Sequence, residues 1–552
     1  MTDATPGATP GTTATTGGIL AADVLARHGV DVVFTLSGGH LFPLYDGCVQ
    51  RGIRLVDTRH EQTATFAAEG WAKVTRGVGI AALTAGPGVT NGISAITAAW
   101  MNGSPLTVLG GRAPQARWGS GSLQELDHVP IVASVTKTAS TATTTARIPA
   151  EIDAALRAAT TPHRGPTFVD VPMDVFFAAA EVVLPEASAR GESAAEPDSD
   201  AVAAVARLAA KAAKPVLVVG GDVYWAGAEA AMCAAAEAAR IPVFVNGLGR
   251  GTLPADHELA FSRARSVALK GADLVIVAGT PLDFRLGFGR FGDARVVHLA
   301  DTPDNVSTNV TLAGSAAGDL ERVFALLADH ATRGARPDHE PWIARLRDEE
   351  DARRAKERDG LEADTSPIHP ARIYGELIPR LDRDAIVIGD GGDFVSYAGK
   401  LVDTYTPGCF LDPGPYGCLG MGSGYALAAA LAHPERQVVL LLGDGAAGFS
   451  LMDFDTLVRF GVNVVAIVGN NGIWGLEKHP MRMIYGYDVA AELRPGTRYD
   501  EVVRALGGDG ELVREPDDVG PALDRAFESD GPVLVNVLTD PADAYPRSSN
   551  LG

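Results

Sequence analysis

The chain has 552 residues, a length that predicts several domains. Its apolar content of 46% and charged content of 21% are those of an ordinary globular protein. A net charge of −21 and a pI near 5.0 argue against nucleic acid or an anionic membrane as a partner. No apolar run is long enough for a membrane span, and the four cysteines form no CxxC pair, so we expect a cytoplasmic protein without a zinc site or disulfides.

The first predicted domain covers residues 18–185, in which helical and strand patterns alternate. Residues 1–17 lack the basic start and apolar segment of a signal peptide and predict a disordered tail. A strand at 30–36 runs into a glycine-rich turn followed by His40, a position that is more often structural than substrate-facing. A strand at 54–58 leads into a helix with Glu61 in its first turn, where an acid is commonly a partner of the helix dipole.

Two further stretches of this domain carry candidate residues. The strand at 80–84 ends in Ala-Gly-Pro-Gly, where Gly86 either makes a tight turn or lets the backbone approach a ligand. Gln124 lies in the stretch SLQELDHV and could simply cap a helix.

The second predicted domain covers residues 200–330 and follows a linker at 181–200 that is rich in proline, serine and acid. Its first strand, at 215–221, ends in Gly220 and Gly221. A later strand ends on Asp301, which is either an ordinary turn residue or a partner for a ribose hydroxyl. The absence of a GxGxxG motif argues against an NAD-dependent dehydrogenase.

The third predicted domain covers residues 366–552 and follows a charged, mostly helical linker at 330–365. The strand that starts at 385 ends in a glycine-rich turn, and the strand at 438–442 runs into Gly-Asp-Gly at 443–445. A helix is predicted at 452–461, and the next strand, at 463–469, ends in Asn470 and Asn471. The carboxyl ends of adjacent parallel strands bind ligands, and aspartate and asparagine oxygens suit Mg²⁺ that carries phosphates.

The pattern therefore predicts an α/β protein with three doubly wound parallel-sheet domains. The spacing from Gly443 to Asn471 resembles the diphosphate-binding signature of thiamine-diphosphate (ThDP) enzymes, and the chain is similar to their acetolactate-synthase and oxalyl-CoA-decarboxylase superfamily. The resemblance implies pyrimidine-binding, central nucleotide-binding and diphosphate-binding domains, with Mg²⁺ held by Asp444, Asn471 and the Ile473 carbonyl. The cofactor-binding residues that it implies are Gly86, Gly391, Gly392, Leu419, Met421, Gly443, Gly445, Ala446, Ala447 and Ile473.

The same resemblance implies catalytic roles for Glu61 and Gln124, and His40 is a further catalytic candidate because of its position after the glycine-rich turn. Glu61 would contact N1′ of the aminopyrimidine and start the proton relay that activates C2 of the thiazolium. Gln124 would lie near the active-site entrance, and His40 would face the substrate. The active site would form between two chains of a homodimer or homotetramer.

The stretch 262–289 resembles the oxalyl-CoA decarboxylase and 2-hydroxyacyl-CoA lyase branch. This implies ADP, or the ADP part of CoA, in the central domain, with Gly220, Gly221, Arg265 and Asp301 as candidate ligands. We therefore expect a small-molecule acyl-CoA substrate and a carbon–carbon lyase that converts 2-hydroxyacyl-CoA to formyl-CoA and an aldehyde or ketone.

Three alternatives stay open. The Ser-Gly-Gly-His stretch at 37–40 departs from both acyl-CoA enzymes and favours an acetolactate-synthase-like enzyme that condenses 2-keto acids. An oxalyl-CoA-type decarboxylase is the second alternative. A catalytically silent nucleotide-binding or regulatory subunit is disfavoured by the presence of Glu61, Asp444 and Asn471.

Overall fold

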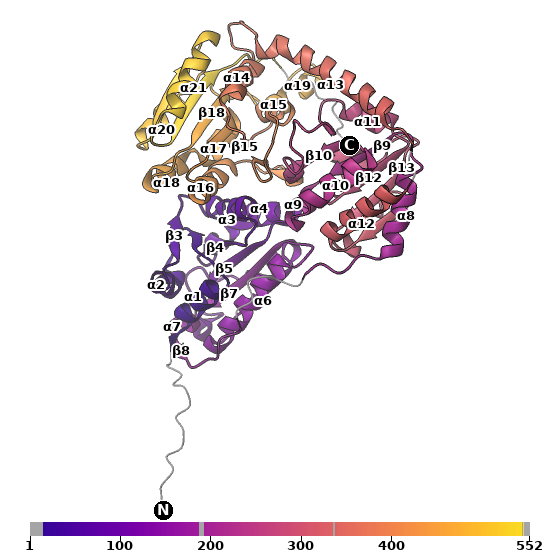
Figure 1. Cartoon of the computed structure of the whole chain (residues 1–552). Coiled ribbons are helices and arrows are strands. Elements are labelled where there is room, and N and C mark those ends of the chain that lie inside the picture. The colour runs from indigo at the N-terminus through magenta and orange to yellow at the C-terminus, as the bar shows by residue number, and fades with distance from the viewer. Residues whose placement is uncertain (1–14, 187–192, 335–336, 544, 546–552) are drawn as a thin grey trace, which may run out of the picture. The chain divides into compact units, whose positions relative to one another are not determined.

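The computed structural model describes residues 15–186, 193–334, 337–543 and 545. Most of the predicted N-terminal tail at 1–17, part of the first linker and nearly all of the last nine residues of the third predicted domain, 544–552, lie outside these residues. The described chain contains three six-stranded sheets in which every paired strand is parallel (Figure 1). The prediction of three parallel-sheet α/β domains is confirmed. Among the described residues, no helix combines the length and the apolar character that crossing a membrane requires.

The N-terminal domain has the strand order β3-β2-β4-β5-β7-β6. A two-residue strand, β1 (Thr15–Thr16), lies within the predicted tail and pairs antiparallel with β8 (Ala179–Ala180). The sheet strands are β2 (Val32–Thr35), β3 (Arg54–Asp57), β4 (Gly79–Leu83), β5 (Leu106–Arg112), β6 (Thr138–Thr141) and β7 (Pro166–Pro172). The helices are α1 (Gly17–Arg27), α2 (Phe42–Gln50), α3 (Glu61–Thr75), α4 (Pro87–Asn102), α5 (Val129–Val132), α6 (Ile148–Thr160) and α7 (Met173–Phe177).

The central domain has the order β11-β10-β9-β12-β13-β14, the order of dinucleotide-binding folds. Its strands are β9 (Pro215–Val219), β10 (Val243–Val245), β11 (Ala260–Phe261), β12 (Leu274–Ala278), β13 (Arg295–Ala300) and β14 (Gly314–Ala317). Its helices are α8 (Ser199–Ala209), α9 (Gly221–Ala226), α10 (Glu229–Ala239), α11 (Arg265–Gly271) and α12 (Leu320–Arg333), and α13 (Glu340–Leu361) follows.

The C-terminal domain has the order β16-β15-β17-β18-β20-β19, which repeats the N-terminal arrangement. Its strands are β15 (Ile386–Asp390), β16 (Phe410–Leu411), β17 (Val438–Gly443), β18 (Val465–Asn470), β19 (Asp509–Val513) and β20 (Val533–Leu538). Its helices are α14 (Pro370–Leu377), α15 (Asp393–Leu401), α16 (Gly422–Ala432), α17 (Asp444–Ser450), α18 (Phe454–Arg459), α19 (Gly475–Tyr485), α20 (Tyr499–Ala505) and α21 (Val519–Phe527).

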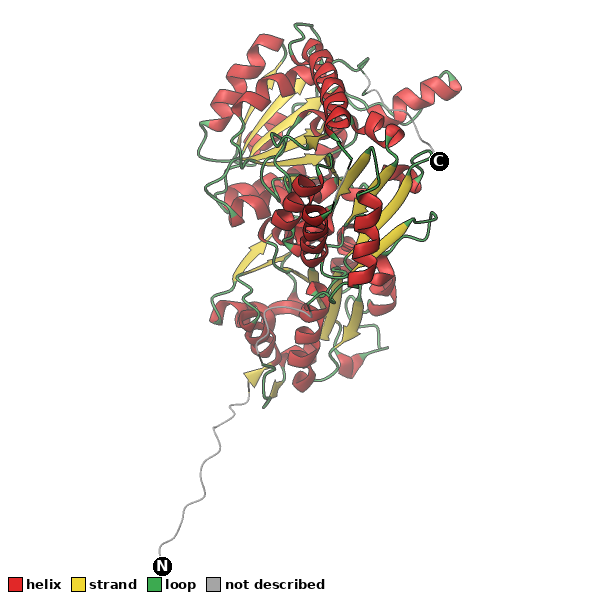
Figure 2. Cartoon of the chain, turned by 45° about the vertical axis from the view of Figure 1, so that its right-hand side comes forward, coloured by secondary structure: helices red, strands yellow, loops and turns green. Residues whose placement is uncertain are grey.

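The helices pack around the strands of each sheet (Figure 2). The strands at the sheet centres, such as β9, β12 and β17, are almost completely buried, which explains their continuous apolar sequences. The N-terminal domain forms one compact unit apart from Gly70–Gly77 and Met101–Gly103, which group with the central and C-terminal domains in the other unit.

Each sheet has a central position where the strand order reverses direction, between β2 and β4, between β9 and β12, and between β15 and β17. Ligands of open α/β sheets bind outside the carboxyl ends of the strands at such positions. The segments that follow these strands contain His40, Gly86, Gly220 and Gly391, and Asp444 directly follows β17 as the first residue of α17. The topology therefore places most of the predicted site residues at ligand-binding positions of their own sheets.

Candidate active site

A cavity of about 510 Å³ lies at the carboxyl edge of the C-terminal sheet. Its walls come from the turns after β15 and β17, the segment after β18 and the start of α19. Among its lining residues are Gly391, Gly392, Leu419, Gly443, Asp444, Gly445, Ala446, Asn471, Ile473 and Trp474. The structure thus brings most of the residues expected to bind the diphosphate into one cavity.

Asp444 is the buried carboxylate of this cavity, with 4% of its surface exposed. Its Oδ1 accepts a hydrogen bond from the Gly445 amide at 2.9 Å, and its Oδ2 accepts one from the Gly472 amide at 2.6 Å. Burial raises the pKa of Asp444 to about 6, although these amide bonds act in the opposite direction. The Asn471 Oδ1 accepts a bond from the Ile473 amide at 3.2 Å. Both side chains line the same cavity, and carboxylate and amide oxygens are ligands that suit Mg²⁺.

Of three glycines in the cavity wall, Gly443 leaves room for a ligand close to the backbone, whereas Gly391 and Gly445 are in close contact with other protein atoms. A Cβ atom built on Gly443 would meet nothing within 4 Å, so a methyl group there would project into open space. Gly391 has a φ of +134°, and its Cβ would lie 3.1 Å from the Gly443 nitrogen. A Cβ on Gly445 would lie 2.3 Å from the Trp474 ring, so that indole packs directly on the backbone. This open, glycine-walled space beside Asp444 and Asn471 fits a diphosphate with its metal ion.

The start of α17 differs from the prediction. The sequence suggested a turn at 443–445 and a helix only at 452–461, whereas α17 begins at Asp444 and is followed by a 3₁₀ turn at Leu451–Asp453 and by α18. Small residues at 445–448 let the helix begin directly at the strand end. Ala446 and Ala447 are buried in its first turns.

The glycine-rich loop before α16 is held by a carboxylate that the sequence analysis did not single out. Asp390, at the end of β15, is fully buried and accepts hydrogen bonds from the amides of Gly420 at 3.1 Å and Gly422 at 2.8 Å. Leu419 lines the cavity, whereas Met421 is completely buried and is not among the lining residues. Of the two predicted residues of this loop, Leu419 is therefore the one that can contact a ligand in the cavity.

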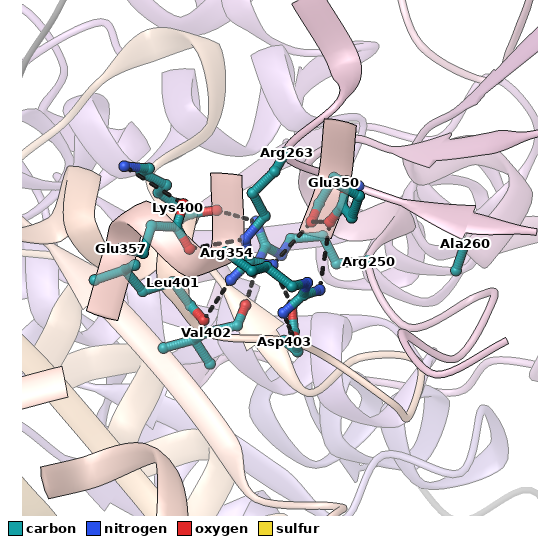
Figure 3. A network of polar contacts seen from close by, with 12 residues as sticks. Arg250, Ala260, Arg263, Glu350, Arg354, Glu357, Lys400, Leu401, Val402 and Asp403 are labelled. Carbon is teal, nitrogen blue, oxygen red and sulfur yellow. Dashed lines mark hydrogen bonds and ion pairs between the residues drawn. The ribbon is translucent and has the colours of Figure 1, made fainter. Parts of the chain in front are cut away.

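The helix α15 starts at the cavity, and its far end is held by a buried ionic network (Figure 3). Arg263 donates to Asp403 at 2.5 Å, to Glu357 at 3.2 Å and to the Leu401 carbonyl at 3.0 Å. Arg250 donates to the carbonyls of Gly399 at 2.8 Å and Val402 at 2.6 Å. Two central-domain arginines thus satisfy carbonyls at the C-terminal end of a helix that shapes the cavity.

The central-domain candidates do not converge on one cavity. Gly220 is explained by packing, because a Cβ there would lie 2.3 Å from the Thr280 Cβ. Asp301 is buried and accepts a bond from Asn305 at 3.0 Å. Arg265 lines a separate cavity of about 720 Å³, which includes neither Asp301 nor the glycine pair Gly220 and Gly221. Within the described residues, the Arg265 Nη2 is buried without a hydrogen-bond partner.

In the N-terminal domain, Glu61 is the first residue of α3 and is 7% exposed. Its Oε2 accepts a hydrogen bond at 3.0 Å from the side-chain amide of Asn91 on α4. The helix that follows the Gly86 turn thus carries the partner of the predicted catalytic acid.

His40, Gly86 and Gln124 lie close together at the same end of this sheet. The His40 Nδ1 is 3.2 Å from the Thr84 hydroxyl, and burial lowers the pKa of His40, with His128 contributing in the same direction. Gly86 has a φ of +61°, and a Cβ there would lie 3.0 Å from the Gln124 Cβ. Gln124 itself has a φ of +59°, which is uncommon for a residue with a side chain.

His128 is a residue of this region that the sequence analysis missed. It is completely buried, and its Nε2 lies 2.9 Å from the Gly86 nitrogen. Its only sequence signal was its position four residues after Gln124.

Comparisons with known proteins agree with this arrangement. Three family models match the chain: the N-terminal TPP binding domain of thiamine pyrophosphate enzymes at residues 15–131, the central domain at 202–327 and the C-terminal TPP binding domain at 390–537. A probable acetolactate synthase of Mycobacterium bovis and an acetolactate synthase large subunit of Mycobacterium tuberculosis are each 55% identical over 537 residues, which cover 97% of both chains.

A human 2-hydroxyacyl-CoA lyase 2 is 34% identical over 579 residues, covering 96% of this chain and 90% of the relative. The three family models follow the order of the three sheets. The chain therefore belongs to the thiamine pyrophosphate enzyme family.

Proposed function

We propose that this chain is a ThDP- and Mg²⁺-dependent enzyme that condenses two 2-keto acids, as acetolactate synthases do. With pyruvate, two molecules would give one acetolactate and one CO₂. The observation that carries the proposal is the 55% identity, over 97% of both chains, to a relative described as an acetolactate synthase large subunit. The lyase reaction favoured by the sequence analysis becomes the second candidate, because the relative of that type is 34% identical.

The residues of the C-terminal cavity fit the roles that the cofactor needs. Asp444, Asn471 and the Ile473 carbonyl would hold Mg²⁺, and the backbone at Gly391, Gly392 and 443–447 would surround the diphosphate. Leu419 would support the bent cofactor from the loop that Asp390 holds. Bound ThDP would supply the electron sink for the carbanion that forms when the carbon–carbon bond breaks.

The residues of the N-terminal domain would supply the proton chemistry. Glu61 would hold the proton at N1′ of the aminopyrimidine, and Asn91 keeps its carboxylate in place. His40, whose lowered pKa keeps the imidazole neutral at pH 7, would orient the substrate by hydrogen bonding rather than by charge. Gln124 and the Gly86 turn would border the substrate. We propose a homodimer or homotetramer in which these groups serve the cofactor held by another chain.

The second candidate, a 2-hydroxyacyl-CoA lyase, is favoured by the cavity at Arg265. This cavity of about 720 Å³ has Arg265, Arg353, Lys356 and Lys400 among its lining residues, together with Glu349 and Glu357. A buried guanidinium nitrogen without a partner among the described residues suits a phosphate group of CoA or ADP.

A product assay with ThDP and Mg²⁺ separates the candidates. The purified protein would be incubated either with pyruvate or with a 2-hydroxyacyl-CoA, and each reaction would be repeated with a Glu61→Gln variant. Acetolactate that is lost in the variant would support the condensing enzyme. Formyl-CoA without acetolactate would overturn it in favour of the lyase, and no product from either substrate would point to a silent subunit.

A further inference from the structure

His128 connects a backbone turn of the predicted active site to a buried charge. Its Nε2 is 2.9 Å from the Gly86 nitrogen, and its Nδ1 is 2.9 Å from the Asp170 Oδ2. Both side chains are completely buried. Asp170, on β7, also accepts bonds from Arg112 at 3.0 Å and from the Thr141 hydroxyl at 2.6 Å. The Asp170 carboxylate is therefore stabilised by three side-chain hydrogen bonds, one of them from a guanidinium group, as a buried charge requires.

The chemistry of the partners fixes the tautomer of His128. A backbone amide can only donate, so Nε2 must carry the lone pair that accepts from Gly86. The proton of the neutral imidazole then lies on Nδ1 and is donated to Asp170. An aspartate that fixes the tautomer of a histidine is a recurrent device for orienting a functional group. Here the oriented group is an acceptor for the amide of Gly86.

The position of Gly86 affects the start of the helix that carries the partner of Glu61. Its positive φ and its closeness to Gln124 leave no room for a side chain, so only its backbone groups can hold it. The amide donates to His128, and the carbonyl accepts from the Thr90 amide of α4 at 3.1 Å. The helix α4 begins at the next residue, Pro87, and carries Asn91, which donates to Glu61 at 3.0 Å. The position of the Gly86 turn therefore sets where α4 starts and how Asn91 reaches Glu61.

We propose that His128, oriented by Asp170, is a positioning residue that fixes the Gly86 turn and, through α4, the Asn91 contact with Glu61. The expected effect of His128 on turnover rests on the proposed function. The structural part of the proposal, the anchoring of the Gly86 amide, holds for the chain without cofactor. If His128 only filled the core, its side-chain volume would be what matters. The positioning role instead requires a hydrogen-bond acceptor at the place of the His128 Nε2.

Two polar substitutions separate these roles. The Oε1 of the His128→Gln variant can occupy the position of Nε2 and accept from Gly86. The His128→Asn variant can still donate to Asp170, but its side chain is too short to reach the turn. Thr141→Val serves as a control, because it removes a different bond to Asp170 and leaves His128 unchanged. Melting temperatures would establish that all three variants fold.

Hydrogen–deuterium exchange of the cofactor-free protein would be measured in peptides that span residues 82–92, and kcat and KM would be measured for the loaded enzyme. We expect His128→Asn to accelerate exchange at Gly86 about 10-fold and to lower kcat about 10-fold or more, since a misplaced active-site group costs up to ~10²-fold. We expect His128→Gln and Thr141→Val to stay within about 3-fold of the wild type in both measurements.

Wild-type exchange in His128→Asn would overturn the anchoring of Gly86. Faster exchange with unchanged kcat, or equal losses of kcat in the Gln and Asn variants, would overturn the positioning role. If the wild type itself makes no acetolactate, the proposed function fails while the exchange data still decide the anchoring. If the Asn variant does not fold, wild-type-like exchange and kcat in the Gln variant support the proposal, and a loss of either overturns it.

Discussion

Two aspartates at the ends of neighbouring strands, Asp390 and Asp444, have different surroundings. The carboxylate of Asp390 is occupied by the amides of Gly420 and Gly422, so it closes a loop. Asp444 also accepts hydrogen bonds from two amides, those of Gly445 and Gly472, but it lines the cavity, where a ligand can reach its carboxylate. Asp390 therefore stabilises a loop of the protein, whereas Asp444 is placed where it can bind a cofactor or its metal ion.

Asp390 should make the stability of the protein fall as the pH rises. Burial raises its pKa to about 7, well above its value in an unfolded chain, and outweighs the two amide bonds. Between those two pKa values the native state binds more protons, so stability is highest below the unfolded pKa and is lost as the pH rises through 7. The loss from this group is at most about 4 kcal/mol.

The measurement is the melting temperature of the wild type and of Asp390→Asn at pH 5 and pH 8. We expect the wild type to lose melting temperature relative to the variant between the two pH values, because the variant has no carboxylate to ionise. If the difference in melting temperature between the wild type and Asp390→Asn were the same at pH 5 and pH 8, Asp390 would be ionised at both pH values.

Glu61→Gln tests the predicted catalytic acid with little change of shape. The amide side chain fills the same volume at the start of α3, but it cannot take up and release a proton. We expect kcat to fall on the order of 10²- to 10⁴-fold, with little change in melting temperature. Asn91→Ala is the matched comparison, since it removes the partner of Glu61 and should cost less. A Gln variant with wild-type kcat would exclude Glu61 from proton transfer.

At the scale of elements, the strands were easier to predict than the contacts between them. The strands predicted at 438–442 and 463–469 are observed as β17 and β18 within about two residues, because buried parallel strands have continuous apolar sequences. The start of α17 was missed, since glycine and alanine after a strand are compatible with either a turn or a helix. Asp390 and His128 were missed because their partners lie 30 to 42 residues away.

The turn between β17 and α17 offers a test of the diphosphate site. A methyl group in Gly443→Ala would enter the open space of the cavity without touching the protein, so we expect normal folding but a ThDP affinity weaker by about 10-fold or more. Gly448→Ala is the control, because Gly448 is exposed on α17 and its Cβ would also meet nothing within 4 Å. Binding would be followed by titration with ThDP and Mg²⁺. Equal affinities of the two variants would place the diphosphate elsewhere.

At the scale of the whole molecule, the network in Figure 3 links the central domain, α13 and the C-terminal domain. In Arg263→Met, Glu357 and Asp403 each lose a buried charge partner, and the Leu401 carbonyl loses a donor. We expect a loss of about 3 kcal/mol, seen as a lower melting temperature of this unit. Arg333→Met, which breaks the exposed Arg333–Asp329 pair, should change stability by less than about 1 kcal/mol. Equal effects of the two substitutions would show that the network adds no specific stability.

The proposed assembly makes a quantitative prediction for mixed oligomers. If each site combines Glu61 of one chain with Asp444 of another, a dimer of one Glu61→Gln chain and one Asp444→Ala chain has one site with both changes and one site with neither. Random pairing makes about half of the dimers mixed, so co-expressed variants should recover about a quarter of the wild-type kcat, although each variant alone is inactive. Activity that stays at the level of the separate variants would show that both residues act within one chain. Light scattering of the same samples would establish that the mixed protein is oligomeric, so that lack of recovery could not come from monomers.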